Sequence, residues 1–373
     1  MFSLPTTSVP SAGSSAPARV GSRPRLRGLD GLRFLAALLV LGYHYTGIGM
    51  PHWGAAPSDV FPGLNQVTRY GFLGVQLFFM ISGFVILMTA YGRPVSAFAA
   101  SRVARLFPAY WAAVVLTVML HLVWHDGRDA SAVDSLLNLT MIQNAWDATD
   151  VQGPFWTLWF EMLFYLIVGA FILVGITRRR VIALAVLWPL VAQLARANDA
   201  DLLSAVLIPS YAPYFAVGML LFLVYRDGGD LAVWLAVALT SVLCVRQAYL
   251  YADRASELVG APVSAVVCAA AVVAMVALLW ALSAGPLRHL DWRVLSTLGA
   301  LTYPLYLVHG QFGFAVIDVL HDDAPRWVVL GLATALSLAL AVVLHHLVEN
   351  RVHDRLRQGV RSGLERGLDT AGR

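Results

Sequence analysis

Two ionisable residues, Arg33 and His44, lie eleven positions apart in a segment that is otherwise mostly apolar. An α-helix turns by about 100° per residue, so this spacing leaves the two side chains about 20° apart around the axis and about 16 Å apart along it. In such a pair, Arg33 could bind an anionic ligand at the edge of a membrane, and His44 could act as a general base half-way across it. A histidine that only hydrogen-bonds between packed helices would explain His44 equally well.

Three more charged residues lie near the ends of predicted helices. Arg102 and Arg105, at positions i and i+3, could bind the phosphates of an anionic ligand that arrives from the cytoplasm. Arginines that only anchor a helix at the cytoplasmic face are the simpler explanation of this pair. Asp30 precedes Arg33 by three residues, which is also the spacing of an ordinary ion pair on a helix.

Polar side chains also interrupt three later apolar segments. Glu161 ends the stretch WTLWFE, where a carboxylate could orient a base, bind hydroxyl groups or only stabilise a helix start. Ser82 and Gly83 are small residues, and alone they indicate close helix packing more than chemistry. Tyr303 and His309 form a second polar patch, and His309 is the next candidate for the base if His44 is structural.

The composition shows what must position these side chains. Of the 373 residues, 59% are hydrophobic and 13% are charged, and the mean hydropathy is +0.70. Soluble domains carry about 25% charged residues, so a soluble enzyme is excluded. All 26 basic residues are arginines, and no basic segment carries the stacking aromatic residues of a nucleic-acid-binding surface.

Apolar runs of roughly 20 residues, long enough to cross the hydrocarbon, recur along the chain. They predict an all-α integral membrane protein, a bundle of about ten transmembrane helices with both termini in the cytoplasm. This orientation places 20 of the 26 arginines on cytoplasmic segments. We expect the fifth span to be short, and tilted or partly interfacial. The predicted spans are 32–48, 72–91, 107–124, 155–176, 181–194, 205–225, 231–250, 263–282, 298–320 and 327–348.

Three regions follow from these spans. Residues 1–24, rich in Ser, Pro, Ala and Gly, predict a disordered cytoplasmic tail. Residues 25–353 form the membrane domain, and residues 354–373 form an arginine-rich cytoplasmic tail. In the longest outer loop, the apolar segment 136–142 predicts a short helix on the membrane interface.

Metal and disulfide chemistry find little support. Cys244 and Cys268 both lie in apolar runs, as small core residues do. His345 and Glu349 have the i, i+4 spacing of metal ligands, but the end of a helix at the cytoplasmic interface explains them more simply. We therefore expect no metal site and no permanently bound cofactor.

Taken together, these segments resemble the membrane-bound acyltransferase-3 family, the sugar and antibiotic O-acyltransferases. The arginine and histidine separated by ten residues and the WTLWFE stretch are the most specific parts. Met162 stands where relatives often carry a second carboxylate. The resemblance keeps the family's order and covers residues 27–44, 78–84, 102–111, 138–143, 156–165 and 303–309.

The resemblance implies roles for the residues above. His44 is implicated in catalysis, with Arg33 as its partner on the first span. Arg102 and Arg105 are implicated in holding the acyl donor, and Glu161 corresponds to the carboxylate of the fourth span. Four further polar residues are candidates for supporting roles: Asp30, Ser82, Tyr303 and His309.

The resemblance also supplies the reaction. An acyl group, acetyl by default, would move from acyl-CoA, which is a substrate here, to a hydroxyl of a polysaccharide, glycolipid or macrolide-type product, with His44 as general base. The protein would lie in a bacterial cytoplasmic membrane. The alternative is a transporter or export module whose buried His, Arg and Glu bind substrate or relay protons, although the chain shows no internal repeat of broken helices.

Overall fold

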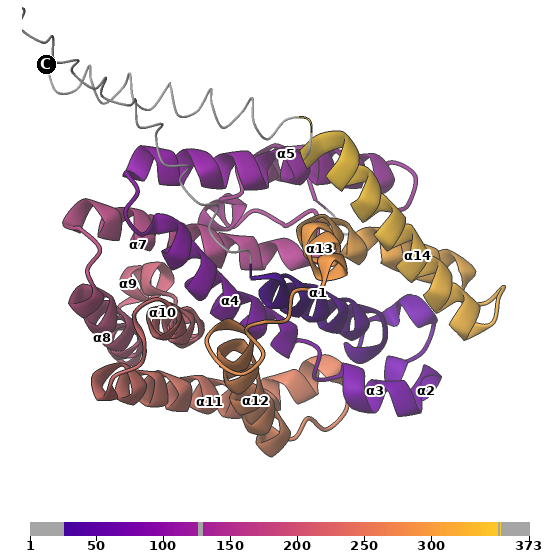
Figure 1. Ribbon diagram of the computed structural model, residues 1–373. Helices are drawn as coiled ribbons and strands as arrows, with labels where there is room; N and C mark the ends of the chain where they lie inside the picture. Colours follow the sequence, from indigo (N-terminus) through magenta and orange to yellow (C-terminus); the bar gives the residue numbers. More distant parts are fainter. Residues whose placement is uncertain (1–25, 126–129, 350, 352–373) are drawn as a thin grey trace, which may run out of the picture.

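The computed structural model describes residues 26–125, 130–349 and 351, and the tails predicted at 1–24 and 354–373 lie outside this range. All regular structure in the described residues is helical (Figure 1). Four short helices connect longer ones: α2 (Pro57–Val60), α3 (Pro62–Thr68), α6 (Ala132–Asn138) and α9 (Asp201–Leu207). The long helices are α1 (Arg27–Gly42), α4 (Leu73–Ala90), α5 (Val95–His121), α7 (Trp156–Val174), α8 (Arg178–Ala197), α10 (Ala212–Asp227), α11 (Leu231–Val259), α12 (Ala265–Ser283), α13 (Arg293–Leu320) and α14 (Arg326–Leu344).

The long helices of the described residues match the ten predicted spans one to one. Within the part of the chain that the structure describes, eight helical segments are long and apolar enough to cross a membrane, and these include all the long helices except α1 and α13. These two carry many of the polar candidates, and they pack against each other. The membrane-helix fold predicted from composition is therefore confirmed, whereas the count of ten spans stays a prediction.

Small residues allow a close contact between α4 and α10. A Cβ atom on Gly83 would lie 2.0 Å from the carbonyl oxygen of Phe215, and one on Gly218 would lie 2.0 Å from that of Met80. Only glycine fits such a crossing, as in other membrane helix pairs. Gly83 therefore packs against α10, while its neighbour Ser82 lines a cavity between α4 and α7.

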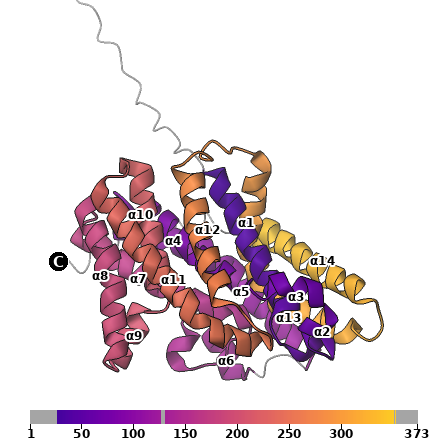
Figure 2. The same ribbon diagram turned by 90° about the horizontal axis from the view of Figure 1, so that it is seen from below.

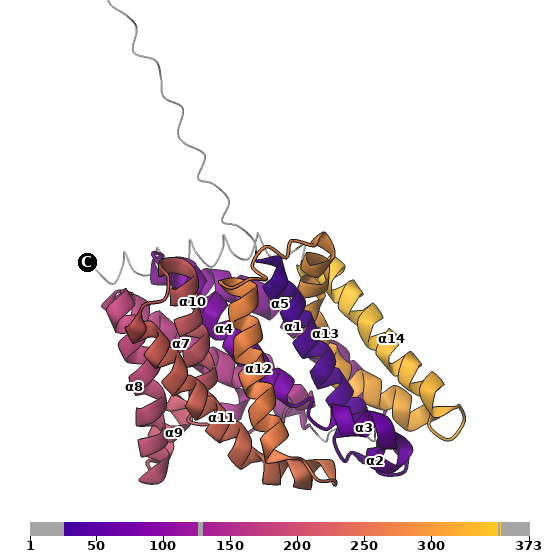
Figure 3. The ribbon, with the colours of Figure 1, turned by 60° about the horizontal axis from the view of Figure 1, so that its bottom comes forward.

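Two ion pairs tie helix starts together at one end of the bundle. Arg27 lies 2.8 Å from Asp291, and Arg178 lies 2.8 Å from Asp230. The hydrogen bond from Arg178 contributes most to lowering the pKa of Asp230 to about 2. We call this end, where α1, α8, α11 and α13 begin, the arginine-rich end. Figures 2 and 3 show α2, α3 and α9 gathered at the opposite end.

Three boundaries differ from the sequence prediction. The fifth span is not short, because α8 has 20 residues and continues through arginines at both of its ends. The segment predicted as the sixth span divides into α9 and α10, since Ile208 adopts a left-handed conformation with φ of 48°. The short loop helix begins earlier than predicted, because Ser131 and Asp134 form a capping box at the start of α6.

Candidate active site

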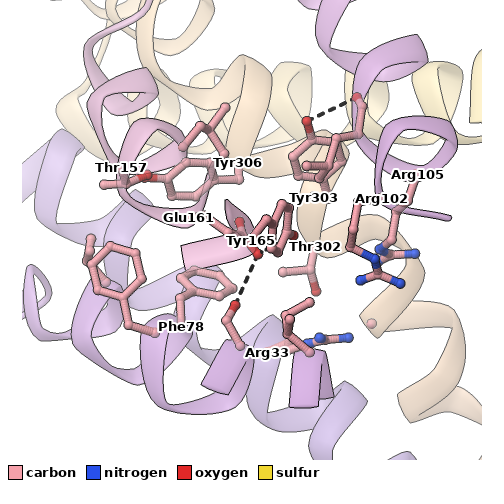
Figure 4. Close-up of a pocket in the computed structure, with 17 residues that line it drawn as sticks. Arg33, Phe78, Arg102, Arg105, Thr157, Glu161, Tyr165, Thr302, Tyr303 and Tyr306 are labelled. Carbon is pink, nitrogen blue, oxygen red and sulfur yellow. Dashed lines mark hydrogen bonds between the residues drawn. The ribbon is translucent and has the colours of Figure 1, made fainter. Parts of the chain in front are cut away.

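A cavity between α1, α4, α5, α7 and α13 gathers most of the polar residues singled out in the sequence (Figure 4). Its volume is about 90 Å³. Aromatic and aliphatic side chains, including Phe78 and Leu158, form much of the remaining wall. The candidates that line it are Arg33, Ser82, Arg102, Arg105, Glu161 and Tyr303.

Among the described residues, only one of the two carboxylate oxygens of Glu161 has hydrogen-bond donors. Its Oε1 atom accepts hydrogen bonds from the Tyr165 hydroxyl at 2.7 Å and from the Ser82 hydroxyl at 3.1 Å. No described residue donates to its Oε2 atom, which can therefore accept from a ligand. Sequence analysis did not single out Tyr165, although a tyrosine four residues after a glutamate shares its helix face.

Positive charge predominates around the cavity. Arg33, Arg102 and Arg105 line it against a single carboxylate, and Figure 4 shows Arg102 and Arg105 next to each other. Arg102 donates to the Ser101 hydroxyl at 3.0 Å, and its guanidinium carbon lies 6.0 Å from the Tyr165 ring centre. Its buried Nε atom has no hydrogen-bond partner. This arrangement suits an anionic ligand.

His44 lies in a π-helical turn, Tyr43–Gly47, that follows α1 directly. A π turn closes i to i+5 hydrogen bonds and is wider than an α turn, so the angle calculated from an ideal α-helix holds only as far as Gly42. Arg33 and His44 nevertheless both lie near α13. Arg33 lines the cavity together with Tyr303 of that helix, and His44 bonds to His309 of the same helix.

The hydrogen bonds of the two histidines fix their tautomers. The Nδ1 atom of His309 lies 2.9 Å from the carbonyl oxygen of Tyr306 and 3.2 Å from that of Leu305. Carbonyl oxygens only accept, so this nitrogen carries a hydrogen. In a neutral His309 the other nitrogen, Nε2, then accepts from His44 Nδ1, which is 3.0 Å away. His44 is left with the lone pair of a base on Nε2.

The side chain of Tyr306 separates the cavity from the histidine pair. Neither histidine is among the residues that line the cavity, whereas Tyr306 is. Its ring centre lies 5.6 Å from that of His309. Its hydroxyl lies 2.5 Å from the Thr157 hydroxyl and donates to the Pro154 carbonyl at 3.1 Å. Tyr306 lies inside the polar patch predicted between Tyr303 and His309 but was not itself predicted as a site residue, although tyrosines at 303 and 306 and a histidine at 309 recur every three residues.

Tyr303, Asp30 and His345 also make contacts within and between helices. Tyr303 donates to the carbonyl of Leu106 at 3.1 Å and so joins α13 to α5. Asp30 lies outside the cavity and faces Ser296, whose hydroxyl is 3.4 Å away. His345 Nδ1 lies 2.8 Å from Glu349.

Metal coordination gains no support from these contacts. Across the described ranges, no group of three or more His, Cys, Asp or Glu side chains is placed to hold a metal ion.

Comparison with known proteins identifies the family. The profile of the acyltransferase-3 family, described as an acyltransferase domain, matches residues 26–346. The chain belongs to this family. The resemblance stated from the motifs is thereby confirmed, and the chain is a multi-pass membrane protein of the acyltransferase-3 family. No solved structure matches it.

Three relatives are similar to part of this chain. A putative peptidoglycan O-acetyltransferase of Bacillus subtilis is 30% identical over 40% of the chain and 24% of its own length. A peptidoglycan O-acetyltransferase of Listeria monocytogenes is 28% identical over 41% of the chain and 25% of its own length. An acyltransferase of Streptomyces mycarofaciens is 29% identical over 38% of each chain. The matches thus span well under half of each relative.

Proposed function

We propose that this protein is an O-acyltransferase of a bacterial cytoplasmic membrane. It moves an acyl group, acetyl by default, from acyl-CoA to a hydroxyl of a carbohydrate or of a glycosylated natural product. One observation carries the proposal: a cavity with three arginines and a half-satisfied carboxylate lies beside a histidine pair of defined tautomer. The names of the peptidoglycan O-acetyltransferase relatives support a hydroxyl-bearing sugar as acceptor.

The donor binds through its phosphates. Arg102 and Arg105 donate charge-assisted hydrogen bonds to the diphosphate of acyl-CoA, because arginine matches phosphate oxygens in both charge and geometry. Arg33, on the facing helix, adds a third positive charge to the same cavity. The thin pantetheine arm then extends into the membrane and places the thioester near Glu161.

The acceptor hydroxyl donates to the Oε2 atom of Glu161 or to Nε2 of His44 as it approaches. His44 takes the hydroxyl proton while the oxygen attacks the thioester carbonyl carbon. The new C–O bond forms, the C–S bond breaks, and His44 returns the proton to the departing thiolate. Because Tyr306 separates the cavity from the histidines, the thioester and the hydroxyl meet where its side chain now lies.

The test uses the purified full chain in lipid nanodiscs with acetyl-CoA and a panel of carbohydrate acceptors. A thiol reagent measures free CoA, and mass spectrometry measures the acetyl ester. We expect acceptor-dependent CoA release with one ester formed per CoA. Uptake of the carbohydrate into vesicles without any CoA release would show a transporter and would contradict the proposal.

A further inference from the structure

A second and larger cavity opens at the arginine-rich end, between the start of α1, the end of α4 and the end of α10. Its volume is about 980 Å³, against about 90 Å³ for the first cavity. Arg33 lines both cavities, so the two spaces adjoin at this side chain. A pocket of several hundred Å³ is the size that holds a nucleotide-sized ligand.

The charge of this second cavity is positive. Its wall carries Arg33, Arg93 and Arg226 with one carboxylate, Asp30. The guanidinium carbon of Arg226 lies 3.4 Å from the centre of the Tyr91 ring, and its Nε atom pairs with Asp227 at 3.2 Å. A guanidinium that stacks on a ring keeps its remaining N–H groups in a fixed plane, which suits a phosphate.

Aromatic rings form the part of the wall next to these charges. Tyr91, Phe222 and Tyr225 all line the cavity. The ring of Phe222 lies 6.1 Å from that of Tyr91 and 6.4 Å from that of Tyr225, centre to centre. A planar base can stack on such a surface, whereas a lipid headgroup has no flat ring to stack there. The wall therefore favours a ligand with both a phosphate and a planar ring.

We propose that this second cavity is the nucleotide subsite of the donor: it binds the adenine and the 3′-phosphate of acyl-CoA. Arg93 and Arg226 bind the 3′-phosphate, and the aromatic wall stacks with adenine. The diphosphate then lies at the junction marked by Arg33, from which the pantetheine arm enters the first cavity. This inference rests on the proposed function, since it names the part of acyl-CoA that this space takes.

The test measures binding of adenosine 3′,5′-bisphosphate to the full chain in nanodiscs, without acceptor or acyl group. The double variant Arg93→Gln, Arg226→Gln should bind this nucleotide about 10²- to 10⁴-fold more weakly, since two charge-assisted contacts are lost. The same variant should raise KM for acetyl-CoA by a similar factor and leave the rate with S-acetylpantetheine, which lacks the nucleotide, unchanged. Arg254→Gln at the opposite end is the matched charge control and should change none of these values.

A cavity-filling variant provides an independent test if the double variant fails to fold. Thr89→Trp keeps every charge but fills the space, and it should also weaken nucleotide binding by about tenfold. Unchanged nucleotide affinity in both variants would overturn the subsite. Binding that responds to the anionic lipid content of the nanodisc but not to these variants would overturn it in favour of a lipid headgroup.

The outcome separates this inference from the proposed function. Nucleotide binding that is lost in the variants, in a protein that transfers no acyl group, would support the subsite and contradict the acyltransferase. Acyl transfer by a protein whose variants bind the nucleotide normally would support the acyltransferase and contradict the subsite.

Discussion

The Nε2 atom of His309 lies 3.0 Å from the Nδ1 atom of His44, across 265 positions of sequence. The contact exists because α1 and α13 pack along each other and because a π turn follows α1 at this level. His309 is anchored in turn by two carbonyl oxygens of its own helix. In the reaction that we propose, the pair acts as one unit, with His309 as the positioning residue and His44 as the base.

Replacing His44 by alanine should abolish most acyl transfer. General-base assistance is typically worth about 10²–10⁴-fold in rate, so kcat should fall by about that factor while acetyl-CoA still binds. Steady-state CoA release and equilibrium donor binding are the two measurements. His289→Ala, in the exposed loop before α13, is the control. Near wild-type rates for His44→Ala across the pH range would make His44 a packing residue.

Substitutions of His309 should separate positioning from packing. Glutamine can accept from His44 through its side-chain oxygen, so His309→Gln should keep kcat within about tenfold of wild type. Leucine fills similar space but cannot accept, so His309→Leu should lose about 10²-fold in kcat with KM for acetyl-CoA unchanged. Equal losses in both variants, read from full kinetic curves, would leave His309 with a purely structural role.

Arg102 and Arg105 should contribute to donor affinity. Each charge-assisted hydrogen bond is worth about 1.5–3 kcal/mol, so Arg105→Ala should weaken acetyl-CoA binding by about 10- to 100-fold. The double variant should weaken it further while the protein still inserts. Binding of a fluorescent CoA analogue in nanodiscs provides the measurement, and Arg254→Ala the control. If Arg105→Ala and the double variant both bound the donor as wild type does, the two arginines would be topology anchors.

Packing at the α4–α10 crossing gives a stability test with a matched control. Gly83→Ala puts a methyl group 2.0 Å from the Phe215 carbonyl, so the helices must separate, and overpacking typically costs about 1–3 kcal/mol. Gly331→Ala, in α14, meets no atom within 4 Å and should leave stability equal or slightly higher. Melting in detergent should show a lower Tm for the first variant alone. Equal Tm values would contradict the close contact.

Labelling of introduced cysteines tests the orientation. Glu257→Cys lies near the end of α11 opposite the arginine-rich end, and Leu287→Cys lies in the loop between α12 and α13. Both native cysteines are buried, so they should not react. In intact cells, a membrane-impermeant maleimide should label position 257 and spare position 287 because arginine-rich ends face the cytoplasm. The reverse pattern would invert the topology, and labelling of both would break the span count.

The sequence predicted the helices well where apolarity alone decides them. Each long helix matches an apolar run, because about 20 apolar residues have little choice but to cross the hydrocarbon. It predicted boundaries less well where local backbone conformation decides them. Pro209 follows the left-handed Ile208 directly, so the end of α9 carried a sequence signal that the prediction of one span over 205–225 did not use. The π turn at Tyr43–Gly47 carries no such signal.

The candidate site also contains residues that the sequence predicted and residues that it did not. The charged residues that line the first cavity were found because a charge in an apolar segment is costly and therefore informative. Tyr165 and Tyr306 were missed because tyrosine is common in membrane helices, and only tertiary contact shows that one supports Glu161 and the other covers the histidines. The tautomer of His44 depends on a partner from a distant helix, so no local pattern could give it.

The hydroxyl of Tyr306 is bonded to Thr157 and to the carbonyl of Pro154, and its ring lies between the arginine-lined cavity and His309. In the reaction that we propose, this side chain has to turn away before an acyl group in the cavity can meet the histidines. The rate of that rotation would then set an upper limit on turnover, whatever the speed of the chemical step.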